Sequence, residues 1–209
     1  MKCTEVSRSQ RFQQLSLNTS KKMHYSLADY ITDLVQNSIE AKSSLIIVDL
    51  LEENSTVKVY IIDNGTGMDE ATLKRVKDPF FTDGSKHEHR KVGLGVSFLS
   101  QMVSQCEGTW DISSEKGEGT SVFFSYVKSH TDAPPMGNIV SAIMCCMGIE
   151  GEYEMKFRRV VDNKEYTVLR SELVDAVGDF SDTDSLLAIR TYLKSLEQEI
   201  LEKKGSIHG

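Results

Sequence analysis

Hydrophobic and polar positions alternate along this chain with two different periods. From 26 to 42 the apolar side chains recur at near-helical spacing, which predicts an amphipathic helix. Residues 45–53 and 55–65 are rich in valine, isoleucine and leucine, and in the second segment apolar and polar positions alternate. We therefore expect two strands that form a hairpin, with Asn54 in the turn between them.

The middle of the chain changes period twice. Residues 68–76 have the spacing of a short helix, whereas 77–91 are polar and without periodicity, which predicts a long loop. Loops of this length are usually functional or disordered. Helical spacing returns from 92 to 106. Two further segments, 109–115 and 120–128, flank a glycine-containing turn and predict a second hairpin.

A shift in composition marks a candidate domain boundary. Residues 129–137 read SHTDAPPMG and hold two of the three prolines. We expect an α/β domain at about 10–130 and a small α+β extension at about 136–209, packed on the first domain or on a partner. The elements predicted beyond the boundary are a helix at 138–149, strands at 152–161 and 164–170, a helix from 171 and a charged helix at 183–204.

The charged last helix also carries an apolar stripe, which suits docking on the sheet or formation of a homodimer. The stripe consists of Leu186, Leu187, Ile189, Leu193, Leu196 and Ile200. The sequence alone leaves both interpretations open.

Bulk composition narrows the class of protein. The chain has 209 residues and a formal net charge of −7, which argues against binding nucleic acid by neutralising phosphates. The longest apolar run, 139–147, has about half of the roughly 20 residues that a membrane crossing needs, and the N-terminus lacks the apolar stretch of a signal peptide. The four cysteines form no CxxC pair, and the adjacent Cys145 and Cys146 are expected in the core. We therefore expect a cytoplasmic protein with no membrane or nucleic-acid partner.

Candidate chemistry begins on the first predicted helix. Asp33 and Asn37 are four residues apart, so their side chains would share one helical face, about 6 Å apart at Cβ. A carboxylate there could orient or deprotonate a water molecule, and the amide oxygen beside it is a hard ligand suited to Mg²⁺. Polar pairs at this spacing are more often solvated surface, so the pair alone does not define a site.

Three glycine-containing segments follow in order. DNGTGM (63–68) comes directly after a predicted strand, where glycines allow a sharp turn and Asp63 could accept a hydrogen bond from an exocyclic amine such as that of adenine. GLG (93–95) opens a predicted helix, whose free N–H groups favour an anion. GEGT (117–120) precedes a strand. Each segment alone is equally typical of an ordinary turn.

Taken in order, these segments resemble the motifs of the GHKL ATPases, the superfamily of histidine kinases, MutL, DNA gyrase and heat-shock chaperone ATPases. DLVQNSIEA (33–41) is similar to the N-box, and DNGTGM, VGLGV and GEGTSVFF are similar to the glycine boxes. DPFF (78–81) resembles the aromatic motif before the mobile ATP lid of histidine kinases. The resemblance spans about 26–128 and implies a two-layer, Bergerat-type sandwich of a mixed sheet and helices.

The resemblance also implies an ATP site with bound Mg²⁺. Asn37 would ligate Mg²⁺, and Asp63 would bind the adenine amino group. The other implied contacts are Gly65, Gly67 and Met68 around the base, Thr120 beside Asp63, and Gly93, Leu94 and Gly95 at the phosphates. Lys86 in the predicted lid is either a cation for the γ-phosphate or an ordinary solvated charge.

Asp33 departs from the family pattern. It stands where hydrolysing members carry a catalytic glutamate, and its side chain is shorter by one methylene. The reach to a water molecule would shrink by about 1.5 Å, and errors of about 1 Å can cost roughly 100-fold in rate. The pattern therefore favours Mg-dependent ATP binding over fast hydrolysis.

Three functions remain open from the sequence. The first is a nucleotide switch or weak ATPase, in which ATP changes how the domain meets an unknown protein partner. The second is a histidine-kinase-like or anti-sigma-type protein kinase, although His24 lacks the acidic neighbour of a phosphoacceptor motif. The third is a non-enzymatic interaction module that has lost ATP, against which the intact Asp63 and its glycines argue.

Overall fold

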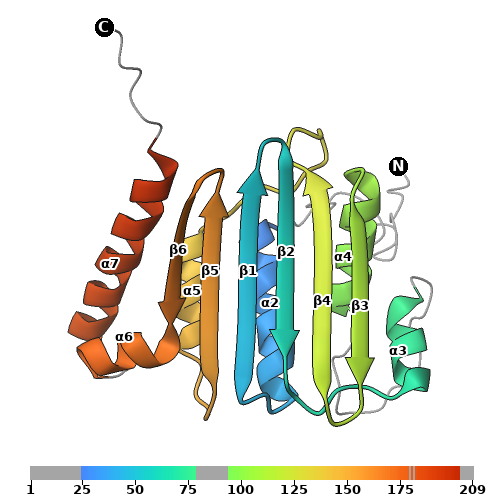
Figure 1. The fold of residues 1–209 in the computed structure, drawn as a ribbon, viewed down its shortest axis with the longest axis horizontal. Helices are drawn as coiled ribbons and strands as arrows, with labels where there is room; N and C mark the ends of the chain where they lie inside the picture. Colours follow the sequence, from blue (N-terminus) through green and yellow to red (C-terminus); the bar gives the residue numbers. More distant parts are fainter. Residues whose placement is uncertain (1–24, 79–93, 179, 181, 203–209) are drawn as a thin grey trace, which may run out of the picture.

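The computed structural model describes residues 25–78, 94–178, 180 and 182–202. These residues form one six-stranded mixed sheet with the order β3-β4-β2-β1-β5-β6 (Figure 1). β1 and β5 are parallel, and the other neighbouring strands are antiparallel. The strands are β1 (Leu45–Glu53), β2 (Thr56–Asp63), β3 (Thr109–Glu115), β4 (Gly119–Val127), β5 (Glu154–Val161) and β6 (Lys164–Leu169).

Helices cover one face of the sheet. In Figure 1, α2, α4 and α5 lie behind the strands, α3 lies beside the β3 edge, and α6 and α7 lie at the β6 edge. The predicted α/β sandwich of a mixed sheet and helices is confirmed. The helices are α2 (Leu27–Glu40), α3 (Glu70–Lys77), α4 (Leu94–Gln105), α5 (Ile139–Met147), α6 (Arg170–Val177) and α7 (Thr183–Leu201). None of the helices in the described ranges is both long and apolar enough to cross a membrane.

The β1–β2 hairpin forms where the alternating pattern predicted it. Ile46, Val48 and Leu50 are fully buried against the helical layer, whereas the intervening side chains are partly exposed on the other face. Asn54 occupies the turn with φ of 53°, a left-handed conformation that asparagine adopts more readily than most residues. The pattern of burial thus fixes which face of the sheet the helices cover.

The N-terminus of α2 is tied to the connection between β4 and α5. The backbone N–H of Leu27 donates to the carbonyl of Pro135 at 2.9 Å, and that of Ala28 donates to Met136 at 3.1 Å. First-turn N–H groups have no partner inside their own helix, so these bonds satisfy donors that would otherwise need water. The helix that carries Asp33 is therefore fastened to the C-terminal part of the chain.

The sheet continues across the predicted domain boundary. β5 pairs in parallel with β1 from Leu45 to Glu52, and β6 then pairs with β5. Ile189, Leu193 and Ile200 of α7 are buried in the same core cluster as the residues of the first five elements. The last helix therefore docks on its own chain, while the division into two domains stays a prediction.

Two positions expected to be buried are exposed. Leu187, assigned to the apolar stripe of the last helix, is 61% exposed because it precedes Ile189 by two residues, about 200° around the helix. Cys145, expected in the core, is exposed, whereas the adjacent Cys146 is buried. Neighbouring helical residues point about 100° apart, so the burial of Cys146 does not require Cys145 to be buried.

A buried charged cluster joins α7 to the sheet. Arg159 of β5 is only 1% exposed, and its Nη2 lies 2.6 Å from Oε2 of Glu52 on β1. Its Nε lies 3.5 Å from Oε1 of Glu197 on α7, and the Tyr166 hydroxyl donates to Oε2 of Glu197 at 2.8 Å. Glu52 is also paired with Lys128. Buried charges need such partners, because removing one leaves the other uncompensated.

This cluster predicts an acid-sensitive contribution to stability. Burial raises the pKa of Glu52, but hydrogen bonds from Arg159 and Lys128 outweigh it and hold the pKa below its ordinary value. The contribution is therefore present at neutral pH and is lost as the pH falls below about 4.3 through the lowered pKa. We expect Glu52→Gln to reduce the free energy of unfolding by about 2 kcal/mol at pH 7, a deficit that shrinks toward acid pH.

Urea unfolding of both proteins at several pH values measures that difference. Glu53→Gln is the matched control, because Glu53 pairs with Lys58 at the surface and such pairs contribute about 1 kcal/mol or less. A Glu52→Gln deficit that is the same at every pH would contradict the expected linkage.

Candidate functional site

The carboxylate of Asp63 lies at the end of β2 and is held by three donors. Ser38 Oγ of α2 donates to Oδ2 at 2.7 Å. Ser43 Oγ shares its one proton between the Ser38 carbonyl oxygen at 2.7 Å and Oδ1 of Asp63 at 3.1 Å. The backbone N–H of Gly65 donates to Oδ1 at 2.9 Å. An ionised carboxylate offers about four lone-pair sites, so Asp63 keeps acceptor capacity for about one more donor. Its side chain is thus fixed in position and still able to bind a ligand.

The turn after Asp63 packs against the β3–β4 turn. Asp63 and Thr120 are directly paired in the β2–β4 register, and Thr120 Oγ1 lies 3.0 Å from Ser114 Oγ. Ser114 Oγ also accepts a hydrogen bond from the backbone N–H of Met68 at 2.9 Å. The structure therefore brings Asp63, Met68 and Thr120 into one cluster, and their roles toward a nucleotide stay predictions.

Two glycines allow this packing because a side chain would collide with backbone. A Cβ on Gly67, which has φ of 60°, would lie 1.9 Å from the carbonyl oxygen of Glu115. A Cβ on Gly65 would lie 2.6 Å from Ser43 Oγ and 2.8 Å from the carbonyl oxygen of Ala41. The glycines of DNGTGM are therefore required by contacts within the chain as well as by any ligand that they border.

Sequence reasoning missed the serines of this cluster. Ser38 and Ser43 bind Asp63, and Ser114 links the two turns. The available signal was the position of Ser38 immediately after Asn37, which turns it toward the buried side of α2. Ser38 is 4% exposed, so its hydroxyl needs a partner, and the neighbouring carboxylate supplies one.

Asn37 and Asp33 lie on the more exposed side of α2. Asn37 is exposed, and its side chain has no hydrogen-bond partner within the described ranges. Asp33 is partly buried, and burial, followed by the nearby Asp29, raises its pKa. A raised pKa makes a carboxylate a better proton acceptor than a freely solvated one, which fits the role proposed from the sequence.

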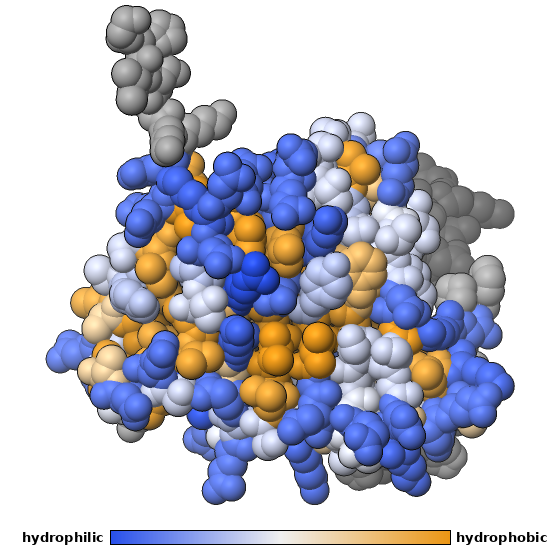
Figure 2. Space-filling view, in the orientation of Figure 1, coloured by the Kyte–Doolittle hydropathy of each residue, from blue (hydrophilic) through white to orange (hydrophobic). Residues whose placement is uncertain are grey.

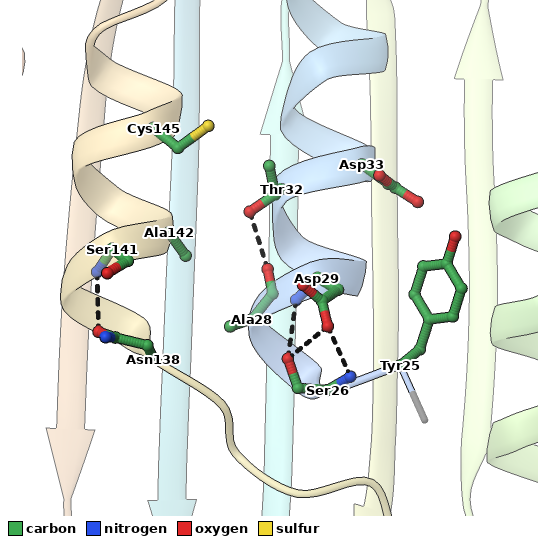
Figure 3. A pocket seen from close by; sticks show the side chains of 10 residues that line it. All are labelled: Tyr25, Ser26, Ala28, Asp29, Thr32, Asp33, Asn138, Ser141, Ala142 and Cys145. Atoms are coloured by element: carbon green, nitrogen blue, oxygen red, sulfur yellow. Dashed lines mark hydrogen bonds between the residues drawn. The ribbon is translucent and has the colours of Figure 1, made fainter. Parts of the chain in front are cut away.

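Asp33 also lines a groove of about 550 Å³ over the first turns of α2 and α5. Figure 3 shows Thr32 and Ala28 projecting from α2 toward α5, whereas Asp33 and Tyr25 project from the opposite side of α2. Asn37 and Asp63 do not line this groove. The groove therefore lies over the N-terminal half of α2, whereas the Asp63 cluster contacts α2 near its C-terminal end, at Ser38.

The remaining predicted contacts fall only partly within the described residues. Lys86 and Gly93 lie outside them, as does the predicted lid after Asp78. Leu94 and Gly95 of the second glycine segment, GLG, lie in the first turn of α4, which begins at Leu94. A helix N-terminus presents free N–H groups, so this placement is compatible with the predicted phosphate contacts, which stay predictions.

Comparison with known proteins agrees with the geometry. The family model described as histidine kinase-, DNA gyrase B-, and HSP90-like ATPase matches residues 25–130. A putative sensor protein of Shewanella frigidimarina is 34% identical over 109 residues, which cover 51% of this chain and 16% of that protein. The sensor histidine kinase YxdK of Bacillus subtilis is 29% identical over 109 residues, which cover 52% and 33%. The chain thus spans a third or less of the length of these two relatives.

Further similarity extends to another branch and to solved structures. The DNA mismatch repair protein MutL of a Geobacillus species is 32% identical over 100 residues, which cover 46% of this chain and 16% of that protein. The catalytic domain of histidine kinase ThkA in a nucleotide-free form has a TM-score of 0.35 at 19% identity, covering 50% of this chain and 64% of that one. Because the family match runs from the start of α2 to just past the end of β4, over half of the chain, this protein belongs to the histidine kinase-, DNA gyrase B-, and HSP90-like ATPases.

Proposed function

We propose that this domain binds ATP in a Mg²⁺-dependent manner and acts as a nucleotide switch or weak ATPase. The observation that carries the proposal is the hydrogen bonding of the Asp63 carboxylate. Its carboxylate is fixed by Ser38, Ser43 and the Gly65 N–H but retains one acceptor position. The 6-amino group of adenine is a donor that suits this position, whereas guanine has a carbonyl acceptor at the same ring position.

The residues around Asp63 fit an adenine base. Gly65 and Gly67 keep side chains out of the turn, and Met68 and Thr120 provide an apolar and a hydroxyl group close to the carboxylate. Pockets for such ligands are mostly apolar with a few fixed polar groups. Asp63 would therefore read the base, and its neighbours would shape the pocket.

Asn37 fits the role of the Mg²⁺ ligand. Its side chain is exposed and unused by the described residues, and a neutral amide oxygen suits a cation that usually takes few protein ligands. When bound, Mg²⁺ would neutralise part of the phosphate charge. Leu94 and Gly95 would donate backbone N–H groups to the phosphates, and Gly93 and Lys86 would complete these contacts.

Asp33 supports slow rather than fast hydrolysis. Its raised pKa suits a general base, but its side chain is one methylene shorter than glutamate. The switch interpretation rests on α2 itself, because the helix that carries Asp33 and Asn37 donates backbone hydrogen bonds to Pro135 and Met136. A nucleotide that shifts α2 would therefore act directly on the connection to the C-terminal elements.

Thermal unfolding with and without nucleotide tests the proposal. A ligand that binds only the folded state stabilises it by about 2.7 kcal/mol at 100 times its dissociation constant, so ATP with Mg²⁺ is expected to raise Tm by several degrees. EDTA should remove most of the gain, and GTP should give little. Absence of a shift with any adenine nucleotide at millimolar concentration would rule out the nucleotide site.

A further inference from the structure

The face of the sheet opposite the helices is open in the described part of the chain. In Figure 1 the strands lie in front of α2, α4 and α5 with no helix over their near side. Figure 2 shows apolar surface gathered at the centre of this face, framed by polar residues. Leu45 is 40% exposed and Ile62 is 43% exposed, which is high for large aliphatic side chains on central strands.

The open-face patch, as we define it, consists of side chains that alternate with the buried ones on β1, β2 and β4. Its members are Leu45, Ile47, Leu51, Tyr60, Ile62 and Phe123. The rings of Tyr60 and Phe123 are 4.8 Å apart between centroids, which makes the patch continuous across β2 and β4. Contiguous apolar patches with a polar frame mark interaction surfaces more often than ordinary solvated faces do.

The sheet register makes this patch complementary to itself. Ile47 pairs with Ile62, and Asp49 pairs with Tyr60, across the central β1–β2 pair. A two-fold axis parallel to the strands and between β1 and β2 exchanges the positions of these strands. In a face-to-face arrangement Ile62 of one copy would then lie opposite Ile47 of the other, and the Tyr60 hydroxyl would lie opposite the Asp49 carboxylate.

The next strands outward follow the same exchange. Arg158 is paired with Asp49 on the β5 side, and Phe123 is paired with Tyr60 on the β4 side. The same axis places Arg158 of one copy over Phe123 of the other, where a guanidinium is attracted to the ring face. Like charges do not meet in these central pairs. We propose that a second copy of this chain packs on the open-face patch by this two-fold contact.

The available area fits a weak, reversible dimer. Six strands at about 4.8 Å spacing span about 24 Å, and about seven residues per strand at about 3.4 Å span a similar length. Contact across the whole open face, of which the open-face patch is a part, would bury about 600 Å² per copy, close to the lower end of specific interfaces, which bury about 1,200–2,000 Å² in total. We therefore expect a dissociation constant on the order of 10 µM.

The contact would leave the nucleotide site accessible. Asp63 faces the helical layer, because Ser38 of α2 binds its carboxylate, whereas the neighbouring Ile62 faces the open side. The dimer and the nucleotide site therefore lie on opposite faces of the sheet. Failure of ATP binding would not affect the dimer proposal, and a monomeric chain would not affect the nucleotide proposal.

Sedimentation of the full chain without nucleotide, from about 1 to about 300 µM, tests the proposal. The wild type is expected to shift from monomer to dimer, and Ile62→Lys is expected to weaken association at least about 10-fold. Leu187→Lys is the matched control, since Leu187 is 61% exposed on α7, away from the patch. This variant should associate like the wild type. Melting temperatures verify that each variant is folded.

Mixing two variants tests the two-fold register. Ile62→Lys and Ile47→Glu alone should each associate at least about 10-fold more weakly than the wild type, because each homodimer would bury two unpaired charges. In the mixed dimer one contact becomes a lysine–glutamate pair and the other remains Ile47 against Ile62, so association should return. A wild type that stays monomeric to about 300 µM, or a mixture that stays monomeric, would overturn the proposal.

Discussion

Replacing Asp63 with asparagine is expected to weaken ATP binding by about 10- to 150-fold, which corresponds to the loss of a hydrogen bond to a charged group worth about 1.5–3 kcal/mol. The carboxylate already accepts from Ser38, Ser43 and the Gly65 N–H, so it contributes its last acceptor position to the base. The asparagine amide replaces one acceptor oxygen with a donor, which would face another donor. Isothermal titration calorimetry measures the change.

Asp111→Asn provides the matched control for Asp63→Asn. Asp111 lies on β3, outside the Asp63 cluster. Its side chain is 66% exposed and forms an ion pair with Lys77 of α3. The same chemical change there should leave the affinity for ATP within about 2-fold, because exposed ion pairs contribute little. If Asp63→Asn folds normally and binds ATP as tightly as the wild type, the carboxylate does not read the base.

Gly119→Ala is expected to destabilise the fold by about 3 kcal/mol or more. Gly119 has φ of 116°, and a Cβ would lie 2.0 Å from the carbonyl oxygen of Asp63 and 2.8 Å from the Cα of Asn64. Both neighbours are backbone atoms, so relief requires β2 and β4 to separate at the end that carries Asp63 and Thr120. Chemical denaturation of the variant and the wild type measures the loss.

Gly117→Ala separates close approach from backbone conformation. Gly117 lies in the same turn with φ of 90°, but a Cβ there meets no atom within 4 Å. Its substitution carries the conformational cost alone, about 1–2 kcal/mol. Equal losses in the two variants would show that the collision with Asp63 is relieved without cost.

Local patterns predicted nearly every element because each depends on residues close in sequence. The helix at α2 and the β1–β2 hairpin follow directly from periodicity and from the Asn54 turn. The parallel pairing of β5 with β1 did not follow, because it joins residues more than 100 positions apart whose local pattern is only that of a strand. Such pairing depends on which exposed edge is available when the chain folds.

The candidate site was predictable to a similar extent. The family resemblance placed Thr120 near Asp63, and the two residues are directly paired in the β2–β4 register, while their roles stay predictions. The contribution of Ser43 and Ser114 could not be predicted from the sequence. A serine hydroxyl has many possible hydrogen-bond partners along a chain, and only the tertiary contacts select one of them. Asp33 was singled out, but its groove with α5 was not, because α5 lies beyond the family resemblance.

The carbonyls of Pro135 and Met136 have a consequence for where this molecule can be divided. The family match ends at residue 130, yet the donors at the start of α2 find their acceptors five and six residues later. A chain cut at residue 130 would lose those acceptors. It would also lose β5, so β1 would become an edge strand with unpaired backbone N–H and C=O groups. The segment matched by the family is therefore smaller than the unit that satisfies its own backbone hydrogen bonds, and β5 and β6 belong to that larger unit.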